Sequence, residues 1–263
     1  MENDEFINEE QNSFKSKIKR INIVGVPVDI CKNEDMDDVI LEILAKPGPK
    51  QIVFLSIWDL LKGRNQKKSF SQYLKTADLI LPISVSLIKG ARFLKKDIPV
   101  RYNPFKAVIT ILSSMENHYK SLFLLGGRKK SLQLAERNVR ETFPELQIVG
   151  RYVGYHSKKV EEDIVQAIYK SSPSLVIVSE GIKEKNLWAY NHRNEFSSSI
   201  FLYYRDCIGI FSERLKRVKE TTFDKGLEIW SEILRNPLKL FLFFPFIRYI
   251  ILLVWYRLFK KNS

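Results

Sequence analysis

Short apolar runs alternate along the chain with segments of helical periodicity, and few folds are compatible with this order. The strand-like runs occupy residues 21–30, 51–57, 77–83, 121–127, 146–155, 174–181 and 199–211. Apolar residues at helical spacing mark 36–44, 86–94, 106–118, 132–143 and 161–170. Strand–helix alternation favours parallel pairing, and strands that are apolar throughout are typical of a sheet covered on both faces. We therefore predict an α/β fold with a doubly wound, mostly parallel sheet and helices on both faces.

The charge of the chain points to a polyanionic partner. Lys and Arg number 43 against 30 Asp and Glu, which gives a formal net charge of +13. Nucleic acid, an acidic membrane face and phosphorylated substrates all suit such an excess, and composition alone does not choose among them. The two cysteines, Cys31 and Cys207, are too few for a disulfide framework and form no zinc motif, so a reducing cytoplasm fits best.

Both ends of the chain differ from its middle. The acidic lead and the basic run after it predict a disordered charged arm over residues 1–20, and we expect no secretory signal because the order of charged and apolar residues is the reverse of one. Residues 21–211 carry the α/β pattern, and residues 212–263 form a basic and then hydrophobic helical appendage. Because Pro245 and Arg248 interrupt its apolar stretch, we expect this appendage to lie in a membrane interface or re-enter rather than span it. The alternative is a helix buried on the domain or in an oligomer.

Ligands of doubly wound sheets gather at the carboxyl ends of the strands. Gly126 and Gly127 end one strand and would allow a phosphate to approach the backbone, although two glycines between a strand and a helix more often form a plain turn. Asp59 follows another strand end and is the nearest candidate for a carboxylate base, with a helix N-cap as its alternative. Lys185 and Trp188 fall in a polar segment after a third strand, which is either a pocket rim or a solvated helix start. No His or Cys has a partner at metal-ligand spacing, so no metal site is predicted.

Several segments together resemble a known family. They are INIVGVPVD at 21–29, ADLILP at 77–82, GARFL at 90–94, LFLLGG at 122–127, AERN with FPELQIVGRYVGY within 135–155, and LKRVK, GLEI and NPLKL towards the end. In order and spacing they resemble the WecG/TagA/CpsF glycosyltransferases. The resemblance implies a Rossmann-like enzyme of surface polysaccharide synthesis that transfers an N-acetylmannosamine-type sugar from a UDP donor to a polyprenyl-pyrophosphate-linked acceptor. It implies neither a cofactor nor an essential metal.

The resemblance also suggests roles for individual residues. Positions near the family's binding cleft are matched by Arg101, Gly126, Gly127 and Arg217. Arg217 suits a pyrophosphate because a guanidinium contacts two oxygens at once, and we count it with Asp59 as a catalytic candidate. We expect Lys185 and Trp188, from the segment that replaces the family's G-S-P-K-Q-E-x-W, to bind substrate together with Arg101 and the two glycines.

The chain departs from the family where the chemistry is expected. The L-P-D-G loop, whose Asp is the family's proposed general base, reads Leu81, Pro82, Ile83 and Ser84 here, and Ile83 cannot accept a proton. The T-x-N-x-E strand end reads Phe54, Ser56 and Trp58. Whether the chain is an enzyme is therefore left open by the sequence.

Two functions from different classes remain. The first is a glycosyltransferase at the cytoplasmic face of the membrane, with a UDP-sugar, a polyprenyl-linked acceptor and an anionic membrane surface as partners. The alternative is a catalytically inactive homologue that binds or scaffolds a polysaccharide-assembly complex. Nucleic acid is not expected, because the positive charge lies beside apolar residues rather than stacking aromatics. A homo-oligomer is compatible with either function.

Overall fold

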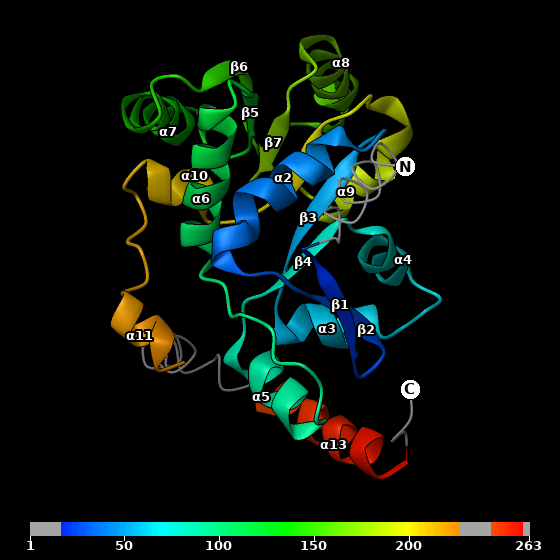
Figure 1. Ribbon diagram of the computed structural model, residues 1–263. Helices are drawn as coiled ribbons and strands as arrows, with labels where there is room; N and C mark the ends of the chain where they lie inside the picture. The colour runs from blue at the N-terminus through cyan, green and yellow to red at the C-terminus, as the bar shows by residue number, and fades with distance from the viewer. Residues whose placement is uncertain (1–16, 227–242, 260–263) are drawn as a thin grey trace, which may run out of the picture.

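A six-stranded sheet forms the centre of the computed structural model, which describes residues 17–226 and 243–259 (Figure 1). The strand order is β4-β3-β8-β7-β5-β6, and every neighbouring pair is parallel. The strands are β3 (Lys50–Leu55), β4 (Leu79–Pro82), β5 (Ser121–Leu125), β6 (Gln147–Tyr152), β7 (Leu175–Val178) and β8 (Ile200–Tyr203). The predicted parallel α/β sheet is thus confirmed.

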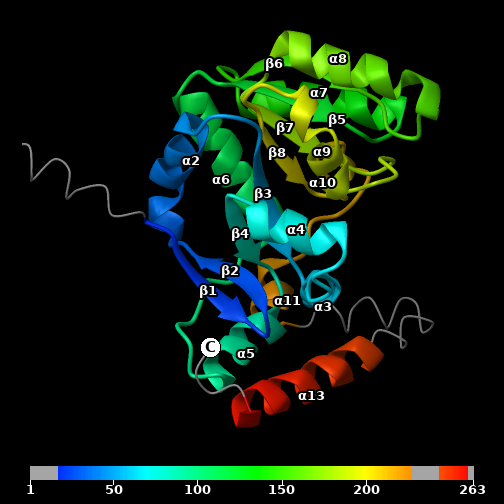
Figure 2. The same ribbon diagram turned by 90° about the vertical axis from the view of Figure 1, so that its right-hand side faces the viewer.

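Helices cover both faces of this sheet. They are α2 (Met36–Ala45), α3 (Ile57–Gly63), α4 (Ser69–Thr76), α5 (Val85–Phe93), α6 (Pro104–Asn117), α7 (Lys129–Thr142), α8 (Glu161–Ser171), α9 (Leu187–Asn191) and α10 (Cys207–Phe211). Alternate residues of one strand point to opposite faces. Ile52 of β3 packs in the core cluster with α2, α6 and α7, whereas Val53 packs in the cluster with α3 and α4. A third cluster holds α8 and α9 against β5 and β7. The elements of these clusters can be followed in Figure 2.

The β-branched residues of segment 21–30 led us to predict one strand of the parallel sheet, and this prediction is wrong. The segment is part of a hairpin of two antiparallel strands, β1 (Lys19–Ile23) and β2 (Val26–Ile30), in a separate sheet. Val24 and Gly25 have φ of 46° and 89°, and a two-residue hairpin turn requires such positive values. Lys19 and Arg20, placed by our prediction in the charged arm, belong to β1, and residues 1–16 lie outside the described residues.

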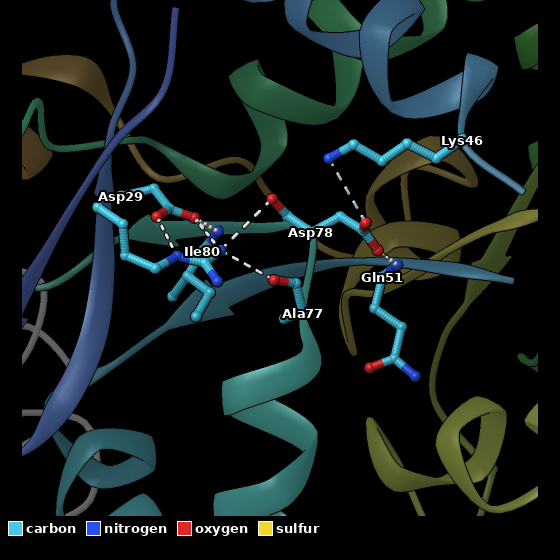
Figure 3. Close-up of polar contacts among 7 residues, drawn as sticks. Asp29, Lys46, Gln51, Ala77, Asp78 and Ile80 are labelled. Atoms are coloured by element: carbon cyan, nitrogen blue, oxygen red, sulfur yellow. Dashed lines mark hydrogen bonds and ion pairs between the residues drawn. The ribbon is translucent and has the colours of Figure 1, made fainter. Parts of the chain in front are cut away.

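The hairpin is fixed to the sheet by a buried carboxylate, Asp29 (Figure 3). Arg20 donates to it twice, from Nε to Oδ1 at 2.7 Å and from Nη2 to Oδ2 at 2.8 Å. The backbone N–H of Ile80, in β4, donates to the same Oδ2 at 2.7 Å. Arg20 also donates to the carbonyl of Ala77 at 2.8 Å. The full set of bonds satisfies a charge that would otherwise be costly to bury.

The last predicted strand, 199–211, is only partly a strand. β8 ends at Tyr203 and the chain turns into α10. The turn is held by Ser179, whose Oγ donates to the carbonyl of Arg205 at 2.7 Å and accepts from the N–H of Ile208 at 3.3 Å. The neighbouring strand β7 ends at Val178, and the apolar residues that follow Tyr203 are buried as a helix.

Two more helices follow, α11 (Glu220–Asp224) and α13 (Phe243–Phe259). Helix α13 packs against α3 and α5, and it buries Tyr249 almost completely. Near its end, the Tyr256 hydroxyl reaches the hairpin turn at Gly25, where a β-carbon would lie 3.0 Å from it. Among residues 17–226 and 243–259, no helix is both long and apolar enough to cross a bilayer.

Candidate functional site

A cavity of about 960 Å³ opens at the carboxyl ends of β3, β4 and β8. Each strand supplies the residues that follow it, Ser56 after β3, Ile83 after β4 and Arg205 after β8. The N-terminus of α6 and the segment from Arg217 to Phe223 complete the wall. This is the edge where parallel α/β sheets bind ligands, because loops diverge there and helices begin there. We call this cavity the cleft.

Asp59 lies in the first turn of α3 and lines the cleft. Its Oδ2 accepts from the Ser56 N–H at 3.2 Å while the Ser56 Oγ accepts from the Asp59 N–H at 3.2 Å, which forms a capping box. The Ser56 hydroxyl also donates to Oδ2 at 2.5 Å. Burial raises the pKa of the Asp59 carboxyl above its ordinary value, and the Ser56 hydrogen bonds oppose that rise. Oδ1 accepts no hydrogen bond from the described residues. Ser56 is therefore the N-cap of α3, and Asp59 completes the capping box from the third helical position with one carboxylate oxygen left for a ligand.

Cations outnumber acids around the cleft. The cations are Lys62, Lys106, Lys185, Arg205 and Arg217, and the acids are Asp59, Asp206 and Glu220. Two of the cations form ion pairs with acids of the cleft: Arg205 lies 2.9 Å from Asp206, and Lys106 lies 3.4 Å from Glu220. The Arg217 guanidinium stacks over the Phe105 ring at 4.7 Å and has no acidic partner in the part of the chain that the structure describes. It is left to bind an anion.

Aromatic rings form another part of the cleft lining. Phe54 and Tyr204 meet edge to face with their centroids 5.9 Å apart, and Trp58 and Tyr203 also line the cavity. Burial raises the pKa of Tyr203 to about 12, so its hydroxyl remains protonated at neutral pH and can donate a hydrogen bond. Rings beside cations provide both stacking surfaces and anion contacts, which is what a nucleotide or sugar diphosphate requires.

Arg101, a predicted substrate-binding residue, does not line the cleft. Its Nε donates to the carbonyl of Ile83 at 3.0 Å and its Nη1 to the carbonyl of Phe223, while its guanidinium lies 3.7 Å from the centre of the Phe223 ring. Ile83 and Phe223 both line the cleft. Arg101 therefore positions two of its walls and attaches α11 to the domain.

Gly126 and Gly127 also lie outside the lining of the cleft. Their N–H groups donate to the carbonyls of Tyr152 and Glu180 at 2.9 and 2.8 Å, so neither is left for a phosphate. A β-carbon at Gly126 would lie 2.9 Å from the Glu180 carbonyl oxygen, and one at Gly127 would overlap Ile208. The expectation of a phosphate-binding role is wrong in this structure, because these residues are glycines to allow close packing at the strand end.

The segment that carries Lys185 and Trp188 divides between the cleft and the core. Lys185 lines the cleft and has a positive φ of 54°. Trp188 is fully buried, and its indole N–H donates to Glu161 Oε1 at 2.6 Å. Trp188 therefore holds α9 against α8 and does not touch the cleft, contrary to our prediction.

The structure thus brings together Asp59, Lys185 and Arg217 of the predicted site. The sequence reasoning missed Lys62 and Lys106, and it did not place Arg205 as a binding residue. Lys62 follows Asp59 by three positions on one helix face, a spacing that predicts proximity once Asp59 is assigned to a helix. No comparable local signal marks the other two, which reach the cleft only through the tertiary fold.

The described residues contain no group of three or more His, Cys, Asp or Glu side chains arranged to hold a metal ion. The positive charge of the cleft comes from lysine and arginine side chains.

Comparison with known proteins relates the chain to characterised enzymes. It is 23% identical over 172 residues to N-acetylglucosaminyldiphosphoundecaprenol N-acetyl-beta-D-mannosaminyltransferase of Bacillus spizizenii, a match that covers 65% of this chain and 66% of that protein, just under two thirds. The enzyme of the same name from Bacillus subtilis is 20% identical over 213 residues, with 80% and 78% covered. That of Staphylococcus aureus strain NCTC 8325 is 18% identical over 204 residues, with 77% and 80% covered.

A model of the family described as "Glycosyl transferase WecG/TagA/CpsF family" matches residues 21–263. The match begins in β1 and continues through α13, so it includes the hairpin and all strands that surround the cleft. The resemblance noted in the sequence is thereby confirmed, and the chain belongs to the WecG/TagA/CpsF family of glycosyl transferases.

Proposed function

We propose that this protein transfers an N-acetylmannosamine-type sugar from a UDP donor to an acceptor sugar carried on a polyprenyl diphosphate. The observation that carries the proposal is the cleft, in which the partly buried carboxylate of Asp59 and the guanidinium of Arg217, which has no acidic partner among the described residues, line one cavity together with Lys185. Membership of the family and the names of the relatives support the same reaction class.

Asp59 takes the role of general base in this proposal. Its Oδ2 is held by Ser56, and Oδ1 accepts the proton of the acceptor hydroxyl as the hydroxyl oxygen bonds to the anomeric carbon. The bond from that carbon to the donor diphosphate breaks, and UDP leaves with the electron pair. Arg217 and Lys185 stabilise the negative charge that develops on the leaving diphosphate. Ile83 lines the same cleft but cannot accept a proton. In this proposal the base therefore follows the neighbouring strand β3 and does not come from position 83.

The donor diphosphate is met by side-chain cations, and we propose that no metal ion is essential. Five lysine and arginine side chains in the cleft support this part of the proposal. Turnover should therefore persist when EDTA is added to the assay. A rate that collapses with EDTA and returns with a divalent cation would contradict it.

We further propose that α13 rests on the cytoplasmic face of an anionic membrane. Its outward side exposes large apolar side chains, namely Phe244, Ile247, Ile251, Leu258 and Phe259. Arg248 is exposed on the same helix, which suits acidic head groups at the edge of an apolar insertion. A cytoplasmic setting is supported by Cys31 and Cys207, both of which are free and buried.

The test is turnover by the purified full chain. UDP-N-acetylmannosamine and an N-acetylglucosaminyl diphosphoprenol in detergent are supplied, and UDP release is measured together with the mass of the lipid product. We expect one N-acetylhexosamine to be added per UDP released. The absence of turnover with a panel of UDP-sugars, combined with UDP binding by calorimetry, would instead support an inactive binding homologue.

The membrane contact is tested by co-sedimentation with vesicles of phosphatidylcholine, with or without phosphatidylglycerol. We expect binding that requires the anionic lipid and is lost in the variant Phe244→Ser/Ile251→Ser/Leu258→Ser. Equal sedimentation of the variant and the wild type would show that this face is not the contact.

A further inference from the structure

A second cavity, of about 570 Å³, lies between α3, α5 and α13. Its walls are almost entirely apolar, with Ile57, Val85, Phe93, Phe246, Ile250 and Val254 among the lining residues. Lys89 is the one charged residue that the described chain contributes to this lining, and no acid does so. A cavity of this size falls within the range of about 300–1,000 Å³ that is typical of small-molecule sites.

This apolar cavity adjoins the cleft. Trp58, Val85 and Ser86 line both. Trp58 precedes Asp59 directly in α3, and Ser86 lies in the first turn of α5, two residues after the cleft residue Ser84. A ligand can therefore extend from the polar cleft, past Trp58, to apolar side chains of α5 and α13.

The cleft is lined by charged side chains and the adjoining cavity by apolar ones, and this difference defines the chemistry of a ligand that would occupy both. Such a ligand has a polar anionic part joined directly to a hydrocarbon chain. A polyprenyl diphosphate has this construction, because its isoprenoid carbons begin at the terminal phosphate oxygen. On the basis of the proposed function, we propose that the cavity between α5 and α13 binds the first isoprene units of the acceptor lipid while the cleft binds its diphosphate and sugar.

The placement of α13 supports this occupant. Ile250 lines the cavity, whereas the next residue, Ile251, is 63% exposed and does not. One helix thus presents an apolar side to the cavity and another to solvent. A lipid chain that enters the cavity from a bilayer beneath α13 meets mostly apolar side chains there, and the burial of its carbons against them is favourable.

The experiment measures binding and does not depend on transfer. The ligands are farnesyl diphosphate, used below its aggregation concentration, and inorganic pyrophosphate, which lacks the chain. Calorimetry on the full-length wild type should show at least a tenfold lower Kd for farnesyl diphosphate. Ile250→Trp fills the cavity and should remove this difference while leaving pyrophosphate binding intact. Ile251→Trp, one position along the same helix, should retain the full difference.

Several results would overturn the inference. One is a wild type that binds the two ligands equally, and another is a difference that persists in Ile250→Trp or disappears equally in Ile251→Trp. If Ile250→Trp does not fold, as judged from its thermal transition, Val254→Phe fills the same cavity and gives the same comparison. Failure of the proposed function is recognised separately, because a protein that shows the chain-dependent difference and yet transfers no sugar has the lipid site without the reaction.

Discussion

Gly90 and Tyr249 fit together because the glycine has no side chain. A β-carbon at position 90 would overlap the Tyr249 hydroxyl, which donates to the carbonyl of Ser86 at 3.2 Å. This fit brings α13 close to α5 and forms one wall of the apolar cavity. The helix that carries the exposed apolar face is therefore seated in the domain by a specific contact.

We expect Gly90→Val to displace Tyr249 and to lower the free energy of unfolding by about 1–3 kcal/mol, which is typical of overpacking. At this chain length, each kcal/mol lowers Tm by about 2–4 °C. Arg92→Val places the same side chain at an exposed position of α5 and should change Tm little. Thermal melts of these two variants, of Tyr249→Ala and of Gly90→Val/Tyr249→Ala test the contact. Strictly additive effects would contradict it.

Replacement of the Asp59 carboxylate should remove the pH dependence of the reaction. A base must be ionised to accept a proton, and burial raises the pKa of Asp59, so the rate should rise with pH to a midpoint above the ordinary range of an aspartate. Asp59→Asn should lower kcat by about 10²- to 10⁴-fold and abolish this rise. Initial rates of both proteins between pH 4 and 8 provide the measurement. An unchanged profile in the variant would assign the base elsewhere.

A rise in pH should increase the reaction rate through Asp59 but decrease the contribution of Asp59 to stability. Since its pKa is raised in the folded state, folding favours the protonated form, and its contribution to stability decreases as pH rises from the unfolded pKa through the folded one. The free energy of unfolding of the wild type relative to Asp59→Asn should therefore decrease over that interval. Urea titrations of both proteins at several pH values check the direction.

A carboxylate at position 83 should substitute for Asp59. Ile83 is partly buried and lines the cleft, so Ile83→Asp places an acid where the family carries its proposed base. In the Asp59→Asn background we expect at least a tenfold recovery of kcat, a fraction of what a general base contributes. Ile83→Asn is the matched control without a titratable group. Equal rates for the two would show that no base is needed at this edge of the cleft.

Arg217 should contribute to UDP binding more than its neighbour in the sequence. A charge-assisted, bidentate contact between a guanidinium and a diphosphate is worth about 1.5–3 kcal/mol, so Arg217→Ala should raise the Kd for UDP roughly ten- to hundredfold. Lys216 is exposed and does not line the cleft, and Lys216→Ala should leave the Kd nearly unchanged. Calorimetry with UDP at fixed ionic strength makes the comparison. Similar losses in both variants would indicate only a general effect of charge.

The pair of Arg20 and Asp29 should matter for stability and not for chemistry. Arg20→Ala leaves a fully buried carboxylate without its cation, a change that typically costs about 3–5 kcal/mol. The cleft does not include either residue, so kcat should stay within a few fold of the wild type wherever the variant is folded. Urea denaturation and initial rates at low temperature separate the two effects. A loss of rate without a loss of stability would contradict this assignment.

The sequence predicted the parallel sheet well, because strands buried on both faces are apolar throughout and the helices between them are periodic. It failed where tertiary contacts decide the conformation. Val24 and Gly25 turn the chain within a run that otherwise reads as one strand. Cys207 begins a helix after a turn that is held by Ser179, which lies directly after the neighbouring strand β7.

The site was predicted less completely than the fold. Asp59 could be found from its place after a strand, and Arg217 from the family resemblance. Trp188 and the glycines at 126 and 127 were misassigned, because residues that maintain the packing of a fold and residues that bind its ligand look alike in a single sequence. Lys106 reaches the cleft from the N-terminus of α6, a position that only the folded chain defines.

The contact between Tyr256 and the turn at Gly25 joins segments from opposite ends of the described chain, and Arg64 lies beneath the same tyrosine ring. A ribosome makes α13 after every surface on which that helix packs. The sheet, the hairpin and α5 can therefore fold before the apolar helix emerges. With the membrane contact that we propose, attachment to lipid would act as a check on completed synthesis, since a chain that stops short of α13 lacks the apolar face on which that contact depends.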